Sequence, residues 1–119
     1  MAIKANQLWI VLVSGQLCDL VRRDVQCWDW FSKKTIGTQL VRSADSIVAN
    51  IVEGYGRSHA LDALRFYSIA RGSLEETLTW LKRANAANLL EKQKYVQWTS
   101  RYQLLSRSLN KFIQVHTPH

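Results

Sequence analysis

Residues 95–112 read YVQWTSRYQLLSRSLNKF, and large apolar side chains return in this stretch at intervals of three or four positions. This spacing follows the turn of an α-helix and places the apolar side chains along one face. They form a single seam: Tyr95, Trp98, Tyr102, Leu105, Leu109 and Phe112. The stretch therefore predicts an amphipathic helix over about residues 91–114, with one side buried in a helical core.

Three earlier segments show the same helical periodicity. We expect helices over about residues 7–28, 36–53 and 59–87, and the short connections between them favour antiparallel neighbours. Gly54 and Gly56 are expected to end the second helix in the left-handed conformation. One proline and five glycines are too few to punctuate the many short strands of a sandwich or barrel. Residues 1–119 thus predict one domain, an all-α, antiparallel up-down four-helix bundle.

The third expected helix carries more apolar surface than one bundle core needs. One of its faces includes Leu74, Leu78 and Leu81. A second face presents four side chains: Phe66, Ile69, Ser73 and Trp80. Because two apolar faces need two burying surfaces, we expect a second copy of the chain to cover the second face. These four residues are the candidate interface of a homo-oligomer.

The chain is basic, with sixteen lysines and arginines against nine acidic residues and a net charge of +7 at pH 7. Such an excess favours anionic partners, namely RNA, DNA or the acidic face of a protein. It is largest in residues 91–119, which hold five basic residues and one acidic residue. The candidate nucleic-acid contacts are Lys33, Lys34, Arg42, Arg57, Lys94, Arg101, Arg107 and Lys111. Alternatively, the charge serves only solubility and the steering of a protein partner.

Aromatic and basic residues alternate after the first expected helix. Trp28, Trp30 and Phe31 stand directly before Lys33 and Lys34. One interpretation is a hydrophobic cap over the end of the bundle. The other is a binding edge, because aromatic rings beside cations can stack on unpaired bases. The sequence leaves both open.

Residues able to do acid–base or metal chemistry are few and scattered. His59, His116 and His119 are the only histidines, and the last two stand in the C-terminal tail. Glu75 and Glu76 are adjacent, so a helix turns them about 100° apart instead of pairing them on one face. We therefore expect a protein that is not an enzyme and holds neither a metal nor a cofactor.

Neither a disulfide nor a membrane segment is expected. Cys18 and Cys27 are separated by a helical rise of roughly 13 Å, too far for a disulfide, and should be free thiols. The apolar run over residues 8–13 is too short for a signal peptide. No stretch approaches the roughly 18 apolar residues of a spanning helix, so we expect a cytoplasmic protein with no membrane partner.

Two runs in the middle of the chain resemble a known family. Residues 39–57 read QLVRSADSIVANIVEGYGR, and residues 65–76 read RFYSIARGSLEE. They are similar to the second and third helices of the four-helix-bundle proteins encoded in 23S rRNA intervening sequences, within a match over most of residues 8–114. The resemblance implies a ring-like homopentamer without enzymatic activity. Relatives of this family include the accessory proteins of diversity-generating retroelements, so it also makes a reverse transcriptase or another RNA-handling protein a candidate partner.

Ser46, Asn50 and Glu53 share one face of the second expected helix. Since buried polar groups need partners, these residues predict either a hydrogen-bonded seam between helices or subunits, or a direct contact to a ligand. With the charge, they lead us to expect a non-enzymatic, homo-oligomeric adaptor that binds RNA, DNA or a nucleic-acid-handling protein through basic surface. The alternative is a purely structural protein–protein interaction module.

Overall fold

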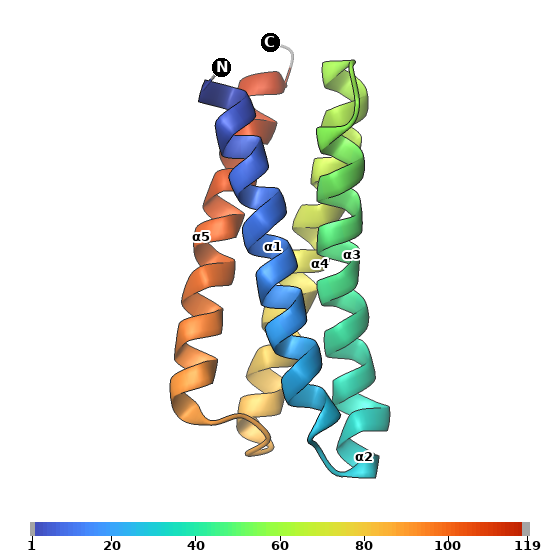
Figure 1. Ribbon diagram of the computed structural model, residues 1–119, viewed down its shortest axis with the longest axis vertical. Helices are drawn as coiled ribbons and strands as arrows, with labels where there is room; N and C mark the ends of the chain where they lie inside the picture. The colour runs from blue at the N-terminus through green and yellow to red at the C-terminus, as the bar shows by residue number, and fades with distance from the viewer. Residues whose placement is uncertain (1, 118–119) are drawn as a thin grey trace.

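Four long helices stand side by side in the computed structural model, which describes residues 2–117 (Figure 1). They are α1 (Ala2–Gln26), α3 (Thr38–Tyr55), α4 (Ala60–Ala86) and α5 (Lys92–His116). A single turn, α2 (Trp30–Ser32), and a π-helical turn, η1 (Lys33–Gly37), lead into α3. Successive long helices run in opposite directions, and both ends of the chain lie at the same end of the bundle. The expected all-α antiparallel bundle is therefore confirmed, and the described residues contain no strand.

The helix bounds differ most from the expected ones at the start of α3. Residues 30–35 are helical, where a loop was expected. Asp29 accounts for the difference, because its carboxylate accepts a hydrogen bond from the Ser32 amide at 3.1 Å and caps the first turn. Side chains are described for residues 7–115 and for Thr117, so the side chain of His116 and all of His119 lie outside this description.

The core is built from the inward faces of all four long helices. The seam expected on the last helix is buried. Tyr95 is half-buried, and the other five members are at most 6% exposed: Trp98, Tyr102, Leu105, Leu109 and Phe112. Tyr67 of α4 lies against Phe112 with ring centroids 6.0 Å apart. Its hydroxyl accepts a hydrogen bond from Gln7 Nε2 of α1 at 2.9 Å. Periodicity in the sequence thus located the core of α5 correctly.

α3 and α4 form the most extensive contact between any two helices, and they meet through short side chains. Thr77 Oγ1 donates to Ser43 Oγ at 2.9 Å, and the hydroxyls of Ser46 and Ser73 lie 2.7 Å apart. We call Ser43, Ser46, Ser73 and Thr77 the hydroxyl seam. Because the four side chains are short, the two backbones approach closely, and each of the four hydroxyls keeps a hydrogen-bond partner.

This close approach corrects the interface expected for a second subunit. Ser73 is only 8% exposed and pairs with Ser46 inside one chain, so it is not available to a partner. Trp80 packs half-buried against the core, and Phe66 is also half-buried. Only Ile69, at 47% exposed, presents open apolar surface. α3 covers Ser73, so this residue was wrongly assigned to a subunit interface, and Phe66, Ile69 and Trp80 stay a prediction.

The polar seam expected on α3 is shorter than predicted. Ser46 lies in it, and Asn50 Nδ2 donates to the Ser46 backbone oxygen at 2.8 Å within the same helix. Glu53 does not belong to it, because this residue is exposed and its carboxylate pairs with Arg57 at 3.1 Å. Glu53 shares the helix face of Ser46, so shared spacing alone did not decide burial.

Gly54 has a different role from the expected one. No glycine has a positive φ, and α3 continues through Gly54 to Tyr55, so the left-handed ending was wrong. A Cβ atom at Gly54 would lie 2.5 Å from Cε1 of Tyr67, a distance that real side chains do not reach. Glycine is thus required here because α4 packs its buried tyrosine ring directly on the α3 backbone.

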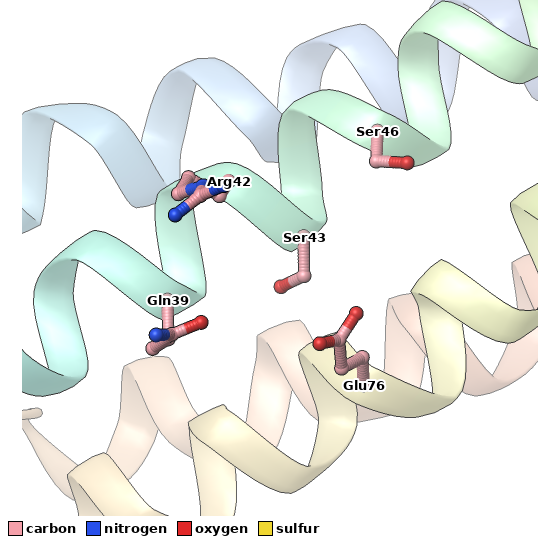
Figure 2. A pocket seen from close by; sticks show the side chains of 5 residues that line it. All are labelled: Gln39, Arg42, Ser43, Ser46 and Glu76. Atoms are coloured by element: carbon pink, nitrogen blue, oxygen red, sulfur yellow. The ribbon is translucent and has the colours of Figure 1, made fainter.

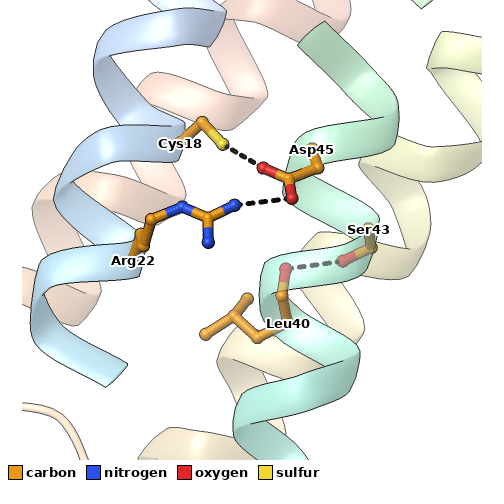
Figure 3. A network of polar contacts seen from close by, with 5 residues as sticks. All are labelled: Cys18, Arg22, Leu40, Ser43 and Asp45. Atoms are coloured by element: carbon orange, nitrogen blue, oxygen red, sulfur yellow. Dashed lines mark hydrogen bonds and ion pairs between the residues drawn. The ribbon is translucent and has the colours of Figure 1, made fainter. Parts of the chain in front are cut away.

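α1 is attached to α3 through one polar cluster (Figure 3). Cys18 Sγ donates to Asp45 Oδ1 at 2.8 Å, and Arg22 Nη2 donates to Asp45 Oδ2 at 2.7 Å. By contrast, α1 and α5 share the least extensive contact of the long-helix neighbours. Of the helices described here, none combines the length and apolarity needed to cross a bilayer.

Candidate nucleic-acid interface

Three cations from three elements line one hollow near the end of the bundle where α2 lies. Its volume is about 310 Å³. The lining residues are Arg22, Val25, Gln26, Lys33, Gly37, Thr38, Val41 and Arg42. The π-helical turn brings Lys33 to this place: Thr38 Oγ1 donates to the Lys33 carbonyl at 2.9 Å. Gly37 lets the turn lie against α1, since a Cβ there would meet Val25 Cγ1 at 2.8 Å.

The charges in this hollow are not equally available. Arg22 is held by the Asp45 carboxylate, whose hydrogen bond raises the pKa of the guanidinium above its ordinary value. Lys33 and Arg42 have no ion-pair partner among the described residues. Their positive charges are therefore uncompensated and free to meet an anion. We call Arg22, Lys33 and Arg42 the basic hollow.

The aromatic cluster before Lys33 divides into two parts. Trp28 is half-buried, and its Nε1 donates to Asp24 Oδ2 at 3.0 Å, so it acts as the expected cap. Trp30 and Phe31 are instead 72% and 68% exposed, on the turn that leads directly to Lys33. Large exposed rings are costly in water unless they meet a partner. The cap interpretation therefore fits Trp28, whereas Trp30 and Phe31 remain a predicted binding edge.

Two of the other predicted cations are neutralised within the chain. Lys94 Nζ lies 2.8 Å from Asp24 Oδ1, and this contact raises the pKa of Lys94. Arg57 pairs with Glu53 and lies 4.7 Å above the centre of the Phe66 ring, which is cation–π geometry.

The remaining four predicted cations occupy different surfaces. Arg101 joins Arg23 at a separate hollow between α5 and α1, which Asp19 also lines. Arg107 and Lys111 are exposed on α5, and Lys34 is exposed on η1. Of the eight predicted residues, only Lys33 and Arg42 therefore line one hollow. Arg22 was missed, because nothing in the sequence indicates that the end of α1 lies beside α3.

A second, polar hollow of about 260 Å³ opens between α3 and α4 (Figure 2). It is lined by Gln39, Arg42, Ser43, Ser46 and Glu76. Figure 2 shows the side chains of Gln39 and Glu76 on facing helices, with the Ser43 hydroxyl directed into the space between them. Arg42 lines both hollows, so the basic hollow and the polar one adjoin each other at this residue.

Titratable groups in the core are held in their neutral forms. Burial, together with the adjacent Asp45 carboxylate, raises the pKa of the Cys18 thiol to about 12. Burial likewise raises the pKa of Tyr102 far above its ordinary value. Within the described residues, no three His, Cys, Asp or Glu side chains are grouped closely enough to hold a metal ion. The polar groups that remain exposed are suited to binding by charge and hydrogen bonding.

Comparison with known proteins places these features in a family. The model of the 23S rRNA-intervening sequence protein family matches residues 8–111. A crystal structure of a protein of unknown function from the S23 ribosomal protein family of Bacteroides thetaiotaomicron superposes with a TM-score of 0.69. The two chains are 19% identical, over 95% of this chain and 96% of the other, which shows a shared fold. Comparison with curated protein sequences gave no match.

Proposed function

The chain belongs to the family of 23S rRNA-intervening sequence proteins, and we propose that it is a non-enzymatic cytoplasmic adaptor that binds single-stranded RNA. The observation that carries this proposal is the basic hollow beside two exposed rings. Arg42 and Lys33 face the same space without an internal counter-ion, and Trp30 and Phe31 lie on the adjoining turn. We call the basic hollow with Lys34, Trp30 and Phe31 the basic end.

Single strands are favoured over duplexes because of the rings. Proteins that bind single strands combine a positive groove for the phosphates with aromatic side chains on which unpaired bases stack. A duplex keeps its bases stacked on each other and would leave Trp30 and Phe31 exposed. The size of the hollow, about 310 Å³, suits a short stretch of backbone better than a whole helix.

Fluorescence anisotropy with a labelled, unstructured RNA tests the proposal. We expect binding at low salt, with an affinity that falls linearly on a double-logarithmic plot as salt is raised. Replacing both Trp30 and Phe31 by alanine should weaken binding at least about tenfold, since stacking contributes about 1–3 kcal/mol per base. Absence of binding even at low salt would contradict the proposal.

We also propose that the chain works as a homo-oligomer, with five subunits as the resemblance implies. The support comes from α1 and α5, not from α4. Leu8 and Leu12 stand one turn apart on α1 and are 46% and 57% exposed, and Leu104 on α5 is 45% exposed. Light scattering should give a mass several times the 13.7 kDa of one chain. A monomer at micromolar concentration would refute this part of the proposal.

A purely structural protein–protein module is the second candidate. It is favoured by the exposed rings of Trp30 and Phe31, because tryptophan and other aromatic residues dominate the centres of protein interfaces. Under this proposal the charge steers a protein with an acidic face. The family resemblance makes a reverse transcriptase or another RNA-handling protein a candidate partner. Retention of an acidic protein by the immobilised chain after nuclease treatment, with no affinity for RNA, would favour this candidate.

A further inference from the structure

The polar hollow between α3 and α4 contains a carboxylate that RNA backbone binding does not explain. Glu76 lines this hollow, and the basic hollow adjoins it at Arg42. A carboxylate beside a phosphate-binding surface repels phosphate, so it weakens binding that depends on charge alone. It does accept hydrogen bonds from N–H groups, which unpaired bases carry on their edges.

The partners of the lining groups show which of them are free. Ser43 Oγ already donates to the Leu40 carbonyl at 3.0 Å and accepts from Thr77. Ser46 is paired with Ser73. Within the described residues, Gln39, Arg42 and Glu76 have no hydrogen-bond or ion-pair partner. The hollow thus has a fixed floor of hydroxyls and a rim of three free groups: the Glu76 carboxylate accepts, the Arg42 guanidinium donates, and the Gln39 amide can do either.

This rim matches one base better than the others. A carboxylate presents two oxygens and binds most strongly where two parallel N–H groups meet it. Guanine carries such a pair on its Watson–Crick edge, at N1 and N2, next to the acceptor O6. Cytosine, adenine and uracil each offer a single donor position on that edge. Glu76 would accept from N1 and N2 of guanine, while the amide of Gln39 or the guanidinium of Arg42 would donate to O6.

We propose that the α3–α4 hollow reads an unpaired guanine while the basic hollow holds its phosphate. This inference rests on the proposed RNA-binding function and adds base selectivity to it. Arg42 is the link between the two parts, because it lines both hollows and can contact the phosphate and the base of one nucleotide. Glu76 is the residue that decides selectivity, since it supplies the only carboxylate lining the hollow.

The test compares short oligouridines that carry one guanine, inosine, adenine or no substitution. The wild-type chain should bind the guanine oligomer about tenfold more tightly than plain oligouridine, the discrimination expected of a good bidentate pair. Inosine lacks the N2 amino group and should lose most of this gain. Glu76→Gln should abolish the preference for guanine while oligouridine binding stays equal or becomes slightly tighter.

Glu75→Gln is the matched control. It removes the same charge from the adjacent exposed position, which does not line the hollow, and should keep the guanine preference. Both side chains are exposed and hold no partner that the fold needs, so both variants should fold.

Failure of guanine selectivity and failure of RNA binding give different results. Binding to all oligomers without a guanine preference would overturn the reading of guanine and leave RNA binding intact. No binding to any oligomer would overturn both. If Glu76→Gln changed the mass of the particle but not the base preference, the hollow would belong to a contact between subunits, and the proposal would be wrong.

Discussion

α3 and α4 meet along a seam of short, paired side chains, whereas α1 and α5 meet sparsely and leave leucines in contact with water. On the first side, Gly54 and the hydroxyl seam let the helix backbones approach, and every member of the seam has a partner. On the second side, Leu12 and Leu104 remain about half exposed. The difference is that the α3–α4 pair is closely packed, whereas the α1–α5 flank leaves apolar surface open, and this flank is the one on which the proposed assembly rests.

The largest effect should come from Gly54→Ala. The new methyl group would meet the Tyr67 ring at 2.5 Å, and this ring is 1% exposed and cannot move away. We expect a loss of roughly 1–3 kcal/mol in the free energy of unfolding, measured by chemical denaturation. The control is Gly72→Ala, where nothing lies within 4 Å and the change should stabilise α4 by at most about 1 kcal/mol. Equal stability of the two variants would contradict the close approach of α3 and α4.

Thr77→Val should have the next largest effect. The Thr77 side chain is fully buried, and its hydroxyl reaches Ser43 Oγ and the Ser73 carbonyl, both at 2.9 Å. Replacing the hydroxyl with a methyl group removes both of these hydrogen bonds from a buried site, at a cost of about 1 kcal/mol. Thr79→Val is the control, because Thr79 is exposed and its hydroxyl only bonds back to Glu75 within α4. A Thr77 variant as stable as the Thr79 variant would show that the hydroxyl seam contributes nothing to stability.

The α1–α5 flank should behave in the opposite way. Changing Leu8 and Leu12 to serine should alter the folding stability of the subunit by no more than about 0.5 kcal/mol per site, because both side chains are exposed in the single chain. The particle mass measured by light scattering should nevertheless fall. Leu61→Ser is the control, since Leu61 is 66% exposed at the start of α4, on a different surface. An unchanged mass in the double variant would place the interface elsewhere.

The two cysteines allow a smaller test of the contact between α1 and α3. Cys27 is exposed and should react quickly with a thiol reagent, while Cys18 should stay protected at neutral pH. The pKa of Cys18 is about 12 against an ordinary 9.0, so the folded chain holds this proton more tightly than the unfolded chain. The protonated Cys18 thiol therefore contributes fully to the stability of the folded chain below pH 9, and this contribution is lost as the pH rises toward 12.

Asp45→Asn sharpens the same test. Removing the carboxylate removes one cause of the raised pKa of Cys18, so labelling of this thiol should become faster, while Cys27 serves as the internal reference. Burial, the larger cause, remains, and the change in rate should be modest. Equal labelling rates of Cys18 and Cys27 in the wild-type chain would contradict the burial of the first thiol.

The sequence predicted the elements well and their contacts poorly. The seam from Trp98 to Phe112 follows from periodicity alone, because a helix fixes which side chains share a face. Periodicity does not say which neighbour covers that face. Ser73 was therefore assigned to a second subunit although α3 covers it, and Glu53 was assigned to a seam that it does not reach.

The candidate site was predicted as a set of cations and, as one of two interpretations, an aromatic and basic edge at Trp30 and Phe31. Lys33 and Arg42 were both named, but their convergence depends on the turn that Asp29 caps and on the tight fit of Gly37 against Val25. Neither contact has a signal in the spacing of the sequence. Arg22 completes the basic hollow from α1, twenty positions before Arg42, so only the packing of α1 on α3 reveals it.

The central claim is that single-stranded RNA binds at the basic end, and the salt dependence of its affinity tests this most directly. Each phosphate contact on a single strand contributes about 0.7 to the slope of log affinity against log salt. Changing both Lys33 and Arg42 to glutamine should lower the slope by about 1.4. Changing Arg107 and Lys111 to glutamine removes the same charge from α5 and should leave the slope nearly unchanged. Equal slopes for the two double variants would show that RNA is bound by the overall charge of the chain and not at the basic end.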